Sequence, residues 1–377
     1  MTEGHERVLT LFLSNGYSLK RWRNEGILSR EILLYQTLLK QGVFDRVQIF
    51  SYNAEDAALV VAEAQYSGID VLTPRRGALF GAQAALWSLW GVLRHRKAIA
   101  GSAWLKTNQV SGAWAAVAAR YLTGRPLMVR LGYVLSRRFA LNGQRLRAGL
   151  AGFVEGIAFS AADSIVVTSE AAAAPLLSAP STARKTHLAP TYVDVSAFAA
   201  KTLYAFDEPV LYIGRLEAQK NILNLVKGCR LAGVGLDIVG VGALEAEIRS
   251  LADEPGSPIR LLGRMPNELL PELLREHSIF ALPSLHEGLP KVLIEAMAAG
   301  LVCVGTDIPG TTDLIRDGET GYLTNGFEPD AIAAALARAF EEKNTEIGTA
   351  ARRVVVDRFS LETYVAREAA LYGAVVQ

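Results

Sequence analysis

The sequence has little cysteine: its 377 residues include only Cys229 and Cys303, which are 74 positions apart. So few cysteines exclude a disulfide framework and a cysteine-based zinc cluster, and they favour a reducing compartment such as the cytoplasm. No apolar run reaches the roughly 20 residues that a membrane-spanning helix needs. The mixed charges of residues 1–7 are unlike the start of a signal peptide. There is no Asp-x-Asp motif and no cluster of His, Cys and carboxylates, so we expect no metal.

Acidic residues are absent between Val71 and Val154, a stretch with 13 basic residues. Residues 1–200 hold 22 Lys and Arg against 13 Asp and Glu, a net charge of +9, whereas the rest of the chain carries −8. A basic half attracts phosphates, an anionic membrane surface or nucleic acid. The alternative is a solvated basic face without a partner. We expect phosphate-bearing partners or an anionic membrane surface, and no nucleic acid.

Short apolar runs alternate with amphipathic stretches, and this rhythm restarts after Asp207-Glu-Pro209. Strands that alternate with helices predict parallel sheets, because a parallel connection needs a covering helix. The predicted strands are residues 7–14, 47–51, 69–72, 126–131 and 164–168, then 210–213, 235–239, 259–262, 278–282 and 302–304. The predicted helices are residues 25–40, 110–122 and 146–161, then 220–232, 243–252, 267–276 and 290–299.

Two such series predict an α/β protein of two Rossmann-like domains. We place the first domain at residues 1–200 and the second at residues 205–360. The last helix, within residues 361–377, is expected to pack back on the first domain.

Residues 77–93 form an uncharged stretch of 17 residues between Arg75-Arg76 and Arg94-His-Arg-Lys97. A helix with Trp87, Trp90 and Leu93 on one side and basic flanks suits a lipid interface. The alternative is an ordinary helix that covers a sheet.

Two glutamates, Glu287 and Glu295, lie in the segment from Ala281 to Gly300. Pro290 is expected to be the first helical residue, which places Glu287 in the preceding loop and Glu295 inside the helix, roughly 12 Å away. The helix N-terminus between them is an anion site. A carboxylate at each end with an anion site between them matches a nucleotide-sugar, which has hydroxyls at both ends and a diphosphate between them. The alternative is a capping glutamate and a solvent-facing one.

Two cations, Arg215 and Lys220, lie five positions apart at an expected strand-to-helix turn, and Gly214 permits close backbone approach there. Such a pair suits the two phosphates of a diphosphate. The alternative is an ordinary surface turn.

These two segments resemble the family-4 retaining glycosyltransferases, which have the GT-B fold of two Rossmann-like domains with parallel sheets facing across a cleft. The similar elements are Gly214-Arg215-Leu216 with Lys220, and the Glu-x(7)-Glu pair of Glu287 and Glu295. The resemblance covers about residues 205–360. The N-terminal half matches only in its alternation of strands and helices.

The resemblance implies a role for each matching residue. Arg215 and Lys220 would bind the donor diphosphate, Glu295 the ribose, and Glu287 the hydroxyls of the transferred sugar near the reacting carbon. The resemblance also implies that the backbone contacts the leaving phosphate at Gly288, Leu289, Pro290 and Lys291. It further implies that Arg264 lines the base pocket and that Gly16 allows a close approach to the donor.

The resemblance further implies a metal-independent retaining enzyme that needs no cofactor. It would move a sugar from a UDP- or GDP-sugar to a glycan or lipid-linked acceptor, in cell-surface polysaccharide or lipopolysaccharide synthesis. We expect it in the cytoplasm, peripheral on the inner face of the plasma membrane. The alternatives are a nucleotide-sugar epimerase on the same fold and a non-catalytic protein that binds nucleotide-sugars.

The sequence departs from the family pattern in the N-terminal half. Many relatives have a histidine after the strand that matches Leu127–Leu131, whereas this chain reads Val129-Arg-Leu-Gly-Tyr133. The usual Gly-Gly turn after the first strand is reduced to Ser14-Asn-Gly-Tyr17. Lys106-Thr-Asn-Gln109 is expected either to contact an acceptor or to cap the next helix. Gly240-Val-Gly-Ala-Leu-Glu245 lacks the third glycine of a dinucleotide fingerprint, so we interpret it as a tight strand–helix turn.

Overall fold

The computed structural model describes residues 6–132, 134, 136, 139 and 143–374. The first five residues, the last three residues of the expected C-terminal helix, and Tyr133 lie outside the described residues. The chain divides into two compact units. Unit 1 comprises Met1–Pro190 and Val365–Gln377, and unit 2 is Thr191–Tyr364.

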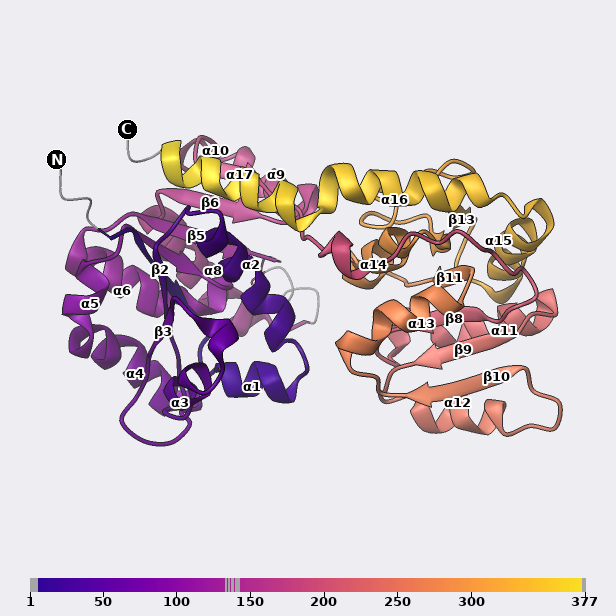
Figure 1. Ribbon diagram of the computed structural model, residues 1–377, viewed down its shortest axis with the longest axis horizontal. Coiled ribbons are helices and arrows are strands. Elements are labelled where there is room, and N and C mark those ends of the chain that lie inside the picture. The colour runs from indigo at the N-terminus through magenta and orange to yellow at the C-terminus, as the bar shows by residue number, and fades with distance from the viewer. Residues whose placement is uncertain (1–5, 133, 135, 137–138, 140–142, 375–377) are drawn as a thin grey trace. The chain divides into compact units, whose positions relative to one another are not determined.

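Unit 1 is built on a seven-stranded parallel sheet in its described part, with strand order β3-β2-β1-β4-β5-β6-β7 (Figure 1). The strands are β1 Val8–Phe12, β2 Arg46–Phe50, β3 Ile69–Leu72, β4 Trp104–Thr107, β5 Leu127–Leu131, β6 Ser164–Val167 and β7 Thr186–Leu188. The helices are α1 Leu19–Asn24, α2 Leu28–Lys40, α3 Asp56–Val61, α4 Gly81–Arg94, α5 Arg96–Ala100, α6 Ala113–Thr123, α8 Arg145–Ala161, α9 Glu170–Leu177 and α10 Pro180–Ala183, with the short 3₁₀ helices η1 Ala64–Tyr66 and η2 Val110–Gly112.

Unit 2 contains a six-stranded parallel sheet in its described part, with strand order β10-β9-β8-β11-β12-β13. The strands are β8 Val210–Ile213, β9 Leu236–Val239, β10 Ile259–Gly263, β11 Ile279–Leu282, β12 Val302–Thr306 and β13 Tyr322–Thr324. The helices are α11 Ile222–Ala232, α12 Glu245–Ala252, α13 Leu270–Glu276, α14 Lys291–Ala299, α15 Pro329–Glu342 and α16 Thr345–Phe359, with η3 Val195–Ala197, η4 Ala218–Lys220 and η5 Asn267–Leu269. The last helix, α17 Leu361–Ala374, begins in unit 2 and continues in unit 1.

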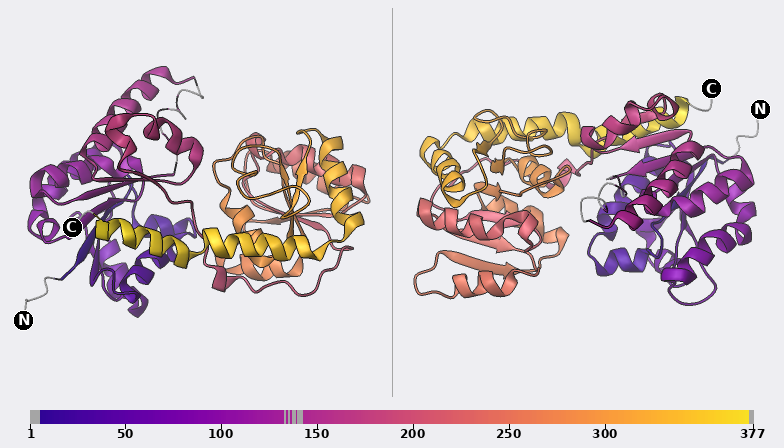
Figure 2. Two further views of the ribbon diagram at one scale, coloured as in Figure 1. Left: turned by 90° about the horizontal axis from the view of Figure 1, so that it is seen from above. Right: turned by 180° about the vertical axis from the view of Figure 1, so that it is seen from behind.

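The central strands are apolar because helices cover both faces of each sheet (Figure 1 and Figure 2). Every residue of β1, β8 and β11 is buried. Helices between strands supply the covering layers, as in α11, which buries Ile222, Leu225 and Val226 on one side. The predicted fold, two Rossmann-like α/β domains with parallel sheets, is therefore confirmed.

Each sheet has one switch point, where the chain connections from two neighbouring strands run toward opposite sides of the sheet. In unit 1 this switch point lies between β1 and β4, and in unit 2 it lies between β8 and β11. Open parallel sheets bind ligands beyond the carboxyl ends of the strands at such a point. The loops after β8 and β11 are the ones that carry Lys220 and Glu287.

Two local expectations are wrong. The predicted 290–299 helix begins one residue later, because Pro290 has extended backbone angles (φ −72°, ψ 107°) and caps α14 from outside. The expectation that Trp87 joins Trp90 and Leu93 on one lipid-facing side also fails, although the Trp87 and Trp90 ring centres are 5.7 Å apart. Trp87 is buried, stacks on Phe50 and donates its ring N–H to the Ser51 carbonyl, whereas Trp90 and Leu93 are exposed.

The polar residues Lys106 to Gln109 cover the end of β4 and the start of the loop that follows, and the Gln109 side chain does not cap the 3₁₀ helix after them. The Lys106 side chain is fully buried against Glu368 of α17, so it is unavailable to an acceptor. The Thr107 hydroxyl accepts the Arg130 backbone N–H, and the Gln109 side-chain oxygen accepts that of Gly132. These side chains join neighbouring elements of unit 1 and do not cap the following helix.

Both cysteines are free and buried. No helix in the described part of the chain combines the length and the hydropathy of a membrane span.

Candidate active site

The loops that follow β8 and β11 meet at one edge of the unit 2 sheet, because these strands are neighbours. The Leu285 N–H donates to the Gln219 carbonyl at 2.8 Å, and the Gln219 side chain returns a bond to the His286 carbonyl at 2.9 Å. This reciprocal pair aligns the two loops. It also sets Lys220 opposite Glu287.

Lys220 and Glu287 form an ion pair in which Nζ lies 2.5 Å from Oε1. Their side chains are 13% and 9% exposed, so the pair is shielded from bulk water but still reachable from solvent. A charge-assisted hydrogen bond in such a place is stronger than a fully exposed one. Two of the predicted site residues, 67 positions apart, are thus in direct contact.

Arg215 lies in the same loop as Lys220 but points into solvent. Its side chain is 63% exposed, and its guanidinium pairs with Glu217 at 2.9 Å. Its carbonyl accepts the hydroxyl of Tyr212, a buried residue of β8, at 3.0 Å. Burial raises the pKa of Tyr212, the negative charge of Glu287 raises it further, and the Arg215 cation opposes both. Arg215 and Glu287 therefore both lie close enough to the Tyr212 hydroxyl to influence it.

A second loop supports the one that carries Arg215. Gly240 follows β9 at φ 147°, and a Cβ at this position would lie 1.8 Å from the Gly214 carbonyl oxygen. The Leu216 N–H donates to the Val241 carbonyl, and the Leu244 N–H donates to the Leu216 carbonyl. The predicted turn at residues 240–245 is therefore tight because it packs against the backbone of the cation-bearing loop.

Helix α14 supplies the other predicted groups. Its first turn presents backbone N–H groups that have no partner within the helix, just beyond exposed Gly288 and partly exposed Leu289. Glu295 lies in the middle of this helix and is partly exposed. The Lys291 ammonium lies 5.1 Å from the centre of the Tyr192 ring. A helix start beside the Lys220–Glu287 pair is suited to an anion.

The backbone at Glu287 and Gly288 is fixed from behind by the loop after β12. Gly310 has φ 87°, and a Cβ there would lie 2.3 Å from the Gly288 carbonyl oxygen. Ser284 and Thr311 are buried hydroxyl residues nearby in sequence whose oxygens have no hydrogen-bond partner among the described residues.

Two predicted residues belong neither to the two joined loops nor to α14. Arg264 is exposed and follows β10, the edge strand, so that β9 separates it from β8. Gly16 belongs to unit 1, where it is buried in the turn after β1 at φ 75°. A Cβ at Gly16 would meet the Leu79 carbonyl oxygen at 3.5 Å.

The residues that hold the loops together were not predicted from the sequence. Gln219 joins the two loops, and Tyr212 supports Arg215 from below. Asn221 ends η4 with left-handed backbone angles and donates its side-chain amide to the Phe327 carbonyl. An asparagine near the start of the predicted 220–232 helix was the available signal, since Asn tolerates this conformation.

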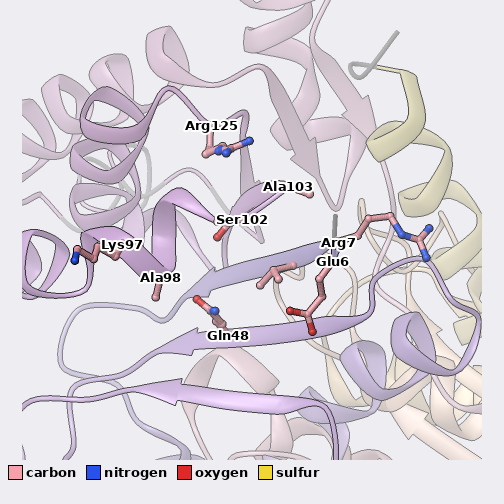
Figure 3. A pocket seen from close by; sticks show the side chains of 10 residues that line it. Glu6, Arg7, Gln48, Lys97, Ala98, Ser102, Ala103 and Arg125 are labelled. Carbon is pink, nitrogen blue, oxygen red and sulfur yellow. The ribbon is translucent and has the colours of Figure 1, made fainter. Parts of the chain in front are cut away.

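Among the described residues there is no group of three or more His, Cys, Asp and Glu side chains that could hold a metal ion. A cavity of about 590 Å³ lies in unit 1 near the start of β1 and β4 (Figure 3). Its lining includes Gln48, Lys97, Ser102 and Arg125 and none of the predicted donor-site residues. The cavity is at the opposite edge of its sheet from the carboxyl ends of the strands.

The family described as glycosyl transferases group 1 matches residues 198–354, the segment that holds both motifs. The match supports the resemblance found in the sequence. Among curated proteins, the amylovoran biosynthesis glycosyltransferase AmsK of Erwinia amylovora is 32% identical over 39% of this chain and 40% of its own length. The phosphatidyl-myo-inositol mannosyltransferase of Mycolicibacterium smegmatis is 32% identical over 43% of this chain and 45% of its own length. The chain thus spans less than half the length of these curated relatives.

Solved structures resemble the whole chain. Sucrose-phosphate synthase from Thermosynechococcus elongatus has a TM-score of 0.76 at 20% identity, and covers 98% of this chain and 99% of its own. HepE from Anabaena, in complex with UDP-glucose, has a TM-score of 0.71 at 20% identity, and covers 98% of this chain and all of its own. At this level of identity the likeness is one of fold.

Proposed function

We propose that the protein is a retaining, metal-independent glycosyltransferase that takes a sugar from a UDP- or GDP-sugar. The observation that carries the proposal is the Lys220–Glu287 ion pair at the switch point between β8 and β11. It places a cation for a phosphate and a carboxylate for sugar hydroxyls within one hydrogen bond of each other. The start of α14 beside them offers a second site for negative charge.

In the proposed complex the donor diphosphate takes over Lys220 from Glu287. The Lys220 ammonium and the first N–H groups of α14, with Arg215 from the loop rim, face the diphosphate, and Glu295 faces the ribose. Glu287, released from its partner, accepts hydrogen bonds from the sugar. Arg264 lines the base pocket, and Gly16 of unit 1 permits close backbone approach.

The reaction breaks the bond between the anomeric carbon and the diphosphate oxygen and forms a bond from that carbon to the acceptor oxygen. Negative charge grows on the departing diphosphate, and fixed cations stabilise it without reorganisation. The leaving phosphate oxygen takes the acceptor proton on the same face of the sugar, which retains the anomeric configuration. Glu287 orients the sugar and stabilises positive charge at the reacting carbon, and it forms no covalent intermediate.

We propose a glycan or lipid-linked acceptor, used in the synthesis of cell-surface polysaccharide or lipopolysaccharide. An acceptor that carries phosphate suits the net charge of +9 on residues 1–200. We place the reaction in the cytoplasm, at the inner face of the plasma membrane.

A thermal-shift screen tests the donor site. The purified protein is heated with UDP, GDP, ADP and their sugars, in EDTA and again with Mg²⁺. Ligands that bind only the folded state raise Tm. At a ligand concentration of one hundred times Kd, they stabilise the folded state by about 2.7 kcal/mol. We expect the nucleotide and the nucleotide-sugar of one base to raise Tm by the same amount in EDTA and in Mg²⁺. A flat response to all nucleotides would contradict the proposal, and a response only with Mg²⁺ would contradict metal independence.

A further inference from the structure

Helix α4 has two apolar faces. One face packs into the core of unit 1 through Ala84, Trp87 and Gly91. The opposite face carries Leu86, Leu89, Trp90 and Leu93, which are 51–71% exposed. Their spacing of i, i+3, i+4 and i+7 places them on one stripe along the helix. A helix that covers a sheet normally presents polar residues on its outer face, so an apolar stripe in that position is unusual.

The stripe does not stand alone on this side of unit 1. Helix α6 packs against both α4 and α8. Helix α8 exposes Leu146, Leu150 and Phe153, which also share one helical face. Figure 1 shows α4, α5 and α6 together along one side of unit 1. The outer faces of α4 and α8 are thus unusually apolar.

Basic residues frame the α4 stripe at both ends. Arg75 and Arg76 precede the helix, and Arg94, Arg96 and Lys97 follow the stripe, all of them exposed. The Arg94 guanidinium lies 5.7 Å from the centre of the Trp90 ring. The sequence of α4, α5 and α6 contains no Asp or Glu, so no carboxylate on these helices offsets the cations.

We infer that the α4 face, meaning Leu86, Leu89, Trp90 and Leu93 with the flanking basic residues, docks on an anionic lipid bilayer. The combination of an apolar stripe with flanking cations favours a lipid bilayer over a second copy of the chain. A second copy joined through this same face would set arginine against arginine, which is costly. A bilayer offers acyl chains to the leucines, anionic headgroups to the cations, and an interface that suits tryptophan. Fourteen residues make a helix of roughly 21 Å, which lies along the surface and does not cross it.

The inference goes beyond the proposed donor chemistry, because every residue of the α4 face belongs to unit 1 and the proposed diphosphate-binding loops belong to unit 2. The α4 face would hold the enzyme where a lipid-linked acceptor is found. Failure of membrane binding would leave the donor site untouched, and failure of donor binding would leave the α4 face untouched.

Flotation of the full chain with vesicles tests the inference. One set of vesicles is pure phosphatidylcholine, and the other contains one quarter phosphatidylglycerol. We expect binding to the anionic set only, weakening at least tenfold between about 0.05 M and 0.5 M NaCl as screening increases. Equal binding to both sets, or no binding, would overturn the inference.

Paired variants separate the two contributions. Leu86→Gln with Leu93→Gln is expected to weaken binding at least tenfold, because two exposed leucines no longer enter the lipid. Arg94→Glu with Arg96→Glu is expected to weaken it similarly and to reduce its salt dependence. The matched control is Leu203→Gln with Leu231→Gln, two exposed leucines of unit 2, which should bind as wild type. Variants of the α4 face that bind as wild type would contradict the inference.

Two further measurements distinguish lipid insertion from self-association. Brominated lipids should quench the tryptophan fluorescence of the wild type more than that of Trp90→Phe. This comparison is informative even if Trp90→Phe binds the vesicles as well as the wild type does. Light scattering should give the same mass for wild type and for the leucine variant without lipid. A dimer that the leucine substitutions dissociate would overturn the lipid assignment in favour of a second copy.

Discussion

Both units contain a largely or fully buried Lys–Glu ion pair of the same length, and the two pairs differ in access to solvent. Lys106 and Glu368 of unit 1 lie 2.5 Å apart and are 0% and 1% exposed. Lys220 and Glu287 of unit 2 lie 2.5 Å apart and are 13% and 9% exposed. Both lysines belong to the strand and loop region at a switch point. The chemical groups are identical, so their surroundings determine what each pair can do.

The unit 1 pair is sealed on every side that the structure describes. Lys106 lies on the face of β4 that α2 and α17 cover, and its ammonium is 5.1 Å from the centre of the Tyr35 ring. The Tyr372 hydroxyl donates to the same Glu368 oxygen that Lys106 contacts. Burial lowers the pKa of Lys106, and the Glu368 charge acts against that shift. This pair joins α17 to the sheet, and no ligand can reach it.

The unit 2 pair is held by the same kind of bond but opens toward solvent at the ends of the strands. Its neighbours are loop backbone and a helix start, which can offer hydrogen bonds to a ligand. The comparison teaches that a lysine at the end of a strand is a candidate ligand contact only if no distant element covers it. Mutation of each pair should therefore affect a different property of the protein.

The largest effect is expected from the sealed pair. Lys106→Met leaves the Glu368 carboxylate buried without its cation, which costs about 3–5 kcal/mol of folding free energy. Lys106→Met combined with Glu368→Leu removes both charges and should recover most of that loss. Urea unfolding measures both variants. A loss below about 1 kcal/mol for the single variant would show that the pair is not sealed in solution.

A smaller effect, on binding and not on stability, is expected from the open pair. Lys220→Ala should weaken nucleotide-sugar binding about 10–100-fold, since it removes a charge-assisted hydrogen bond worth about 1.5–3 kcal/mol. Arg215→Ala is the matched comparison. It should weaken binding by only a few fold, because its exposed guanidinium is screened and shared with Glu217. Calorimetry measures both, and unchanged affinity in Lys220→Ala would remove the lysine from the site.

The sequence predicted most strands of both units because buried parallel strands are continuous apolar runs and their covering helices are periodic, but the predicted strands do not include β4, β7 and β13. The resemblance to the family-4 glycosyltransferases also implied one site for Lys220 and Glu287, and the structure brings these two side chains into contact. The sequence did not reveal that Lys106 is sealed, since its partner lies 262 positions away in the last helix.

Helical periodicity also left open which side of α4 faces the sheet. The pattern grouped Trp87 with Trp90, yet only Trp87 of the two is buried in the core, where it stacks on Phe50. The backbone angles of Pro290 were also not predicted, because they too depend on contacts that the local sequence does not show. Proline fixes φ in either position, and the close packing of Gly310 on the preceding residues involves a loop that is distant in sequence.

The central claim is that Glu287 handles the transferred sugar while Lys220 holds the diphosphate. The most direct test is Glu287→Gln, with donor affinity measured by calorimetry and turnover measured as release of the nucleoside diphosphate from the donor. The account predicts a Kd within about threefold of wild type, because the amide still accepts hydrogen bonds. It predicts a kcat at least one hundredfold lower, equivalent to about 2.7 kcal/mol of lost transition-state stabilisation. Wild-type turnover in this variant would contradict it.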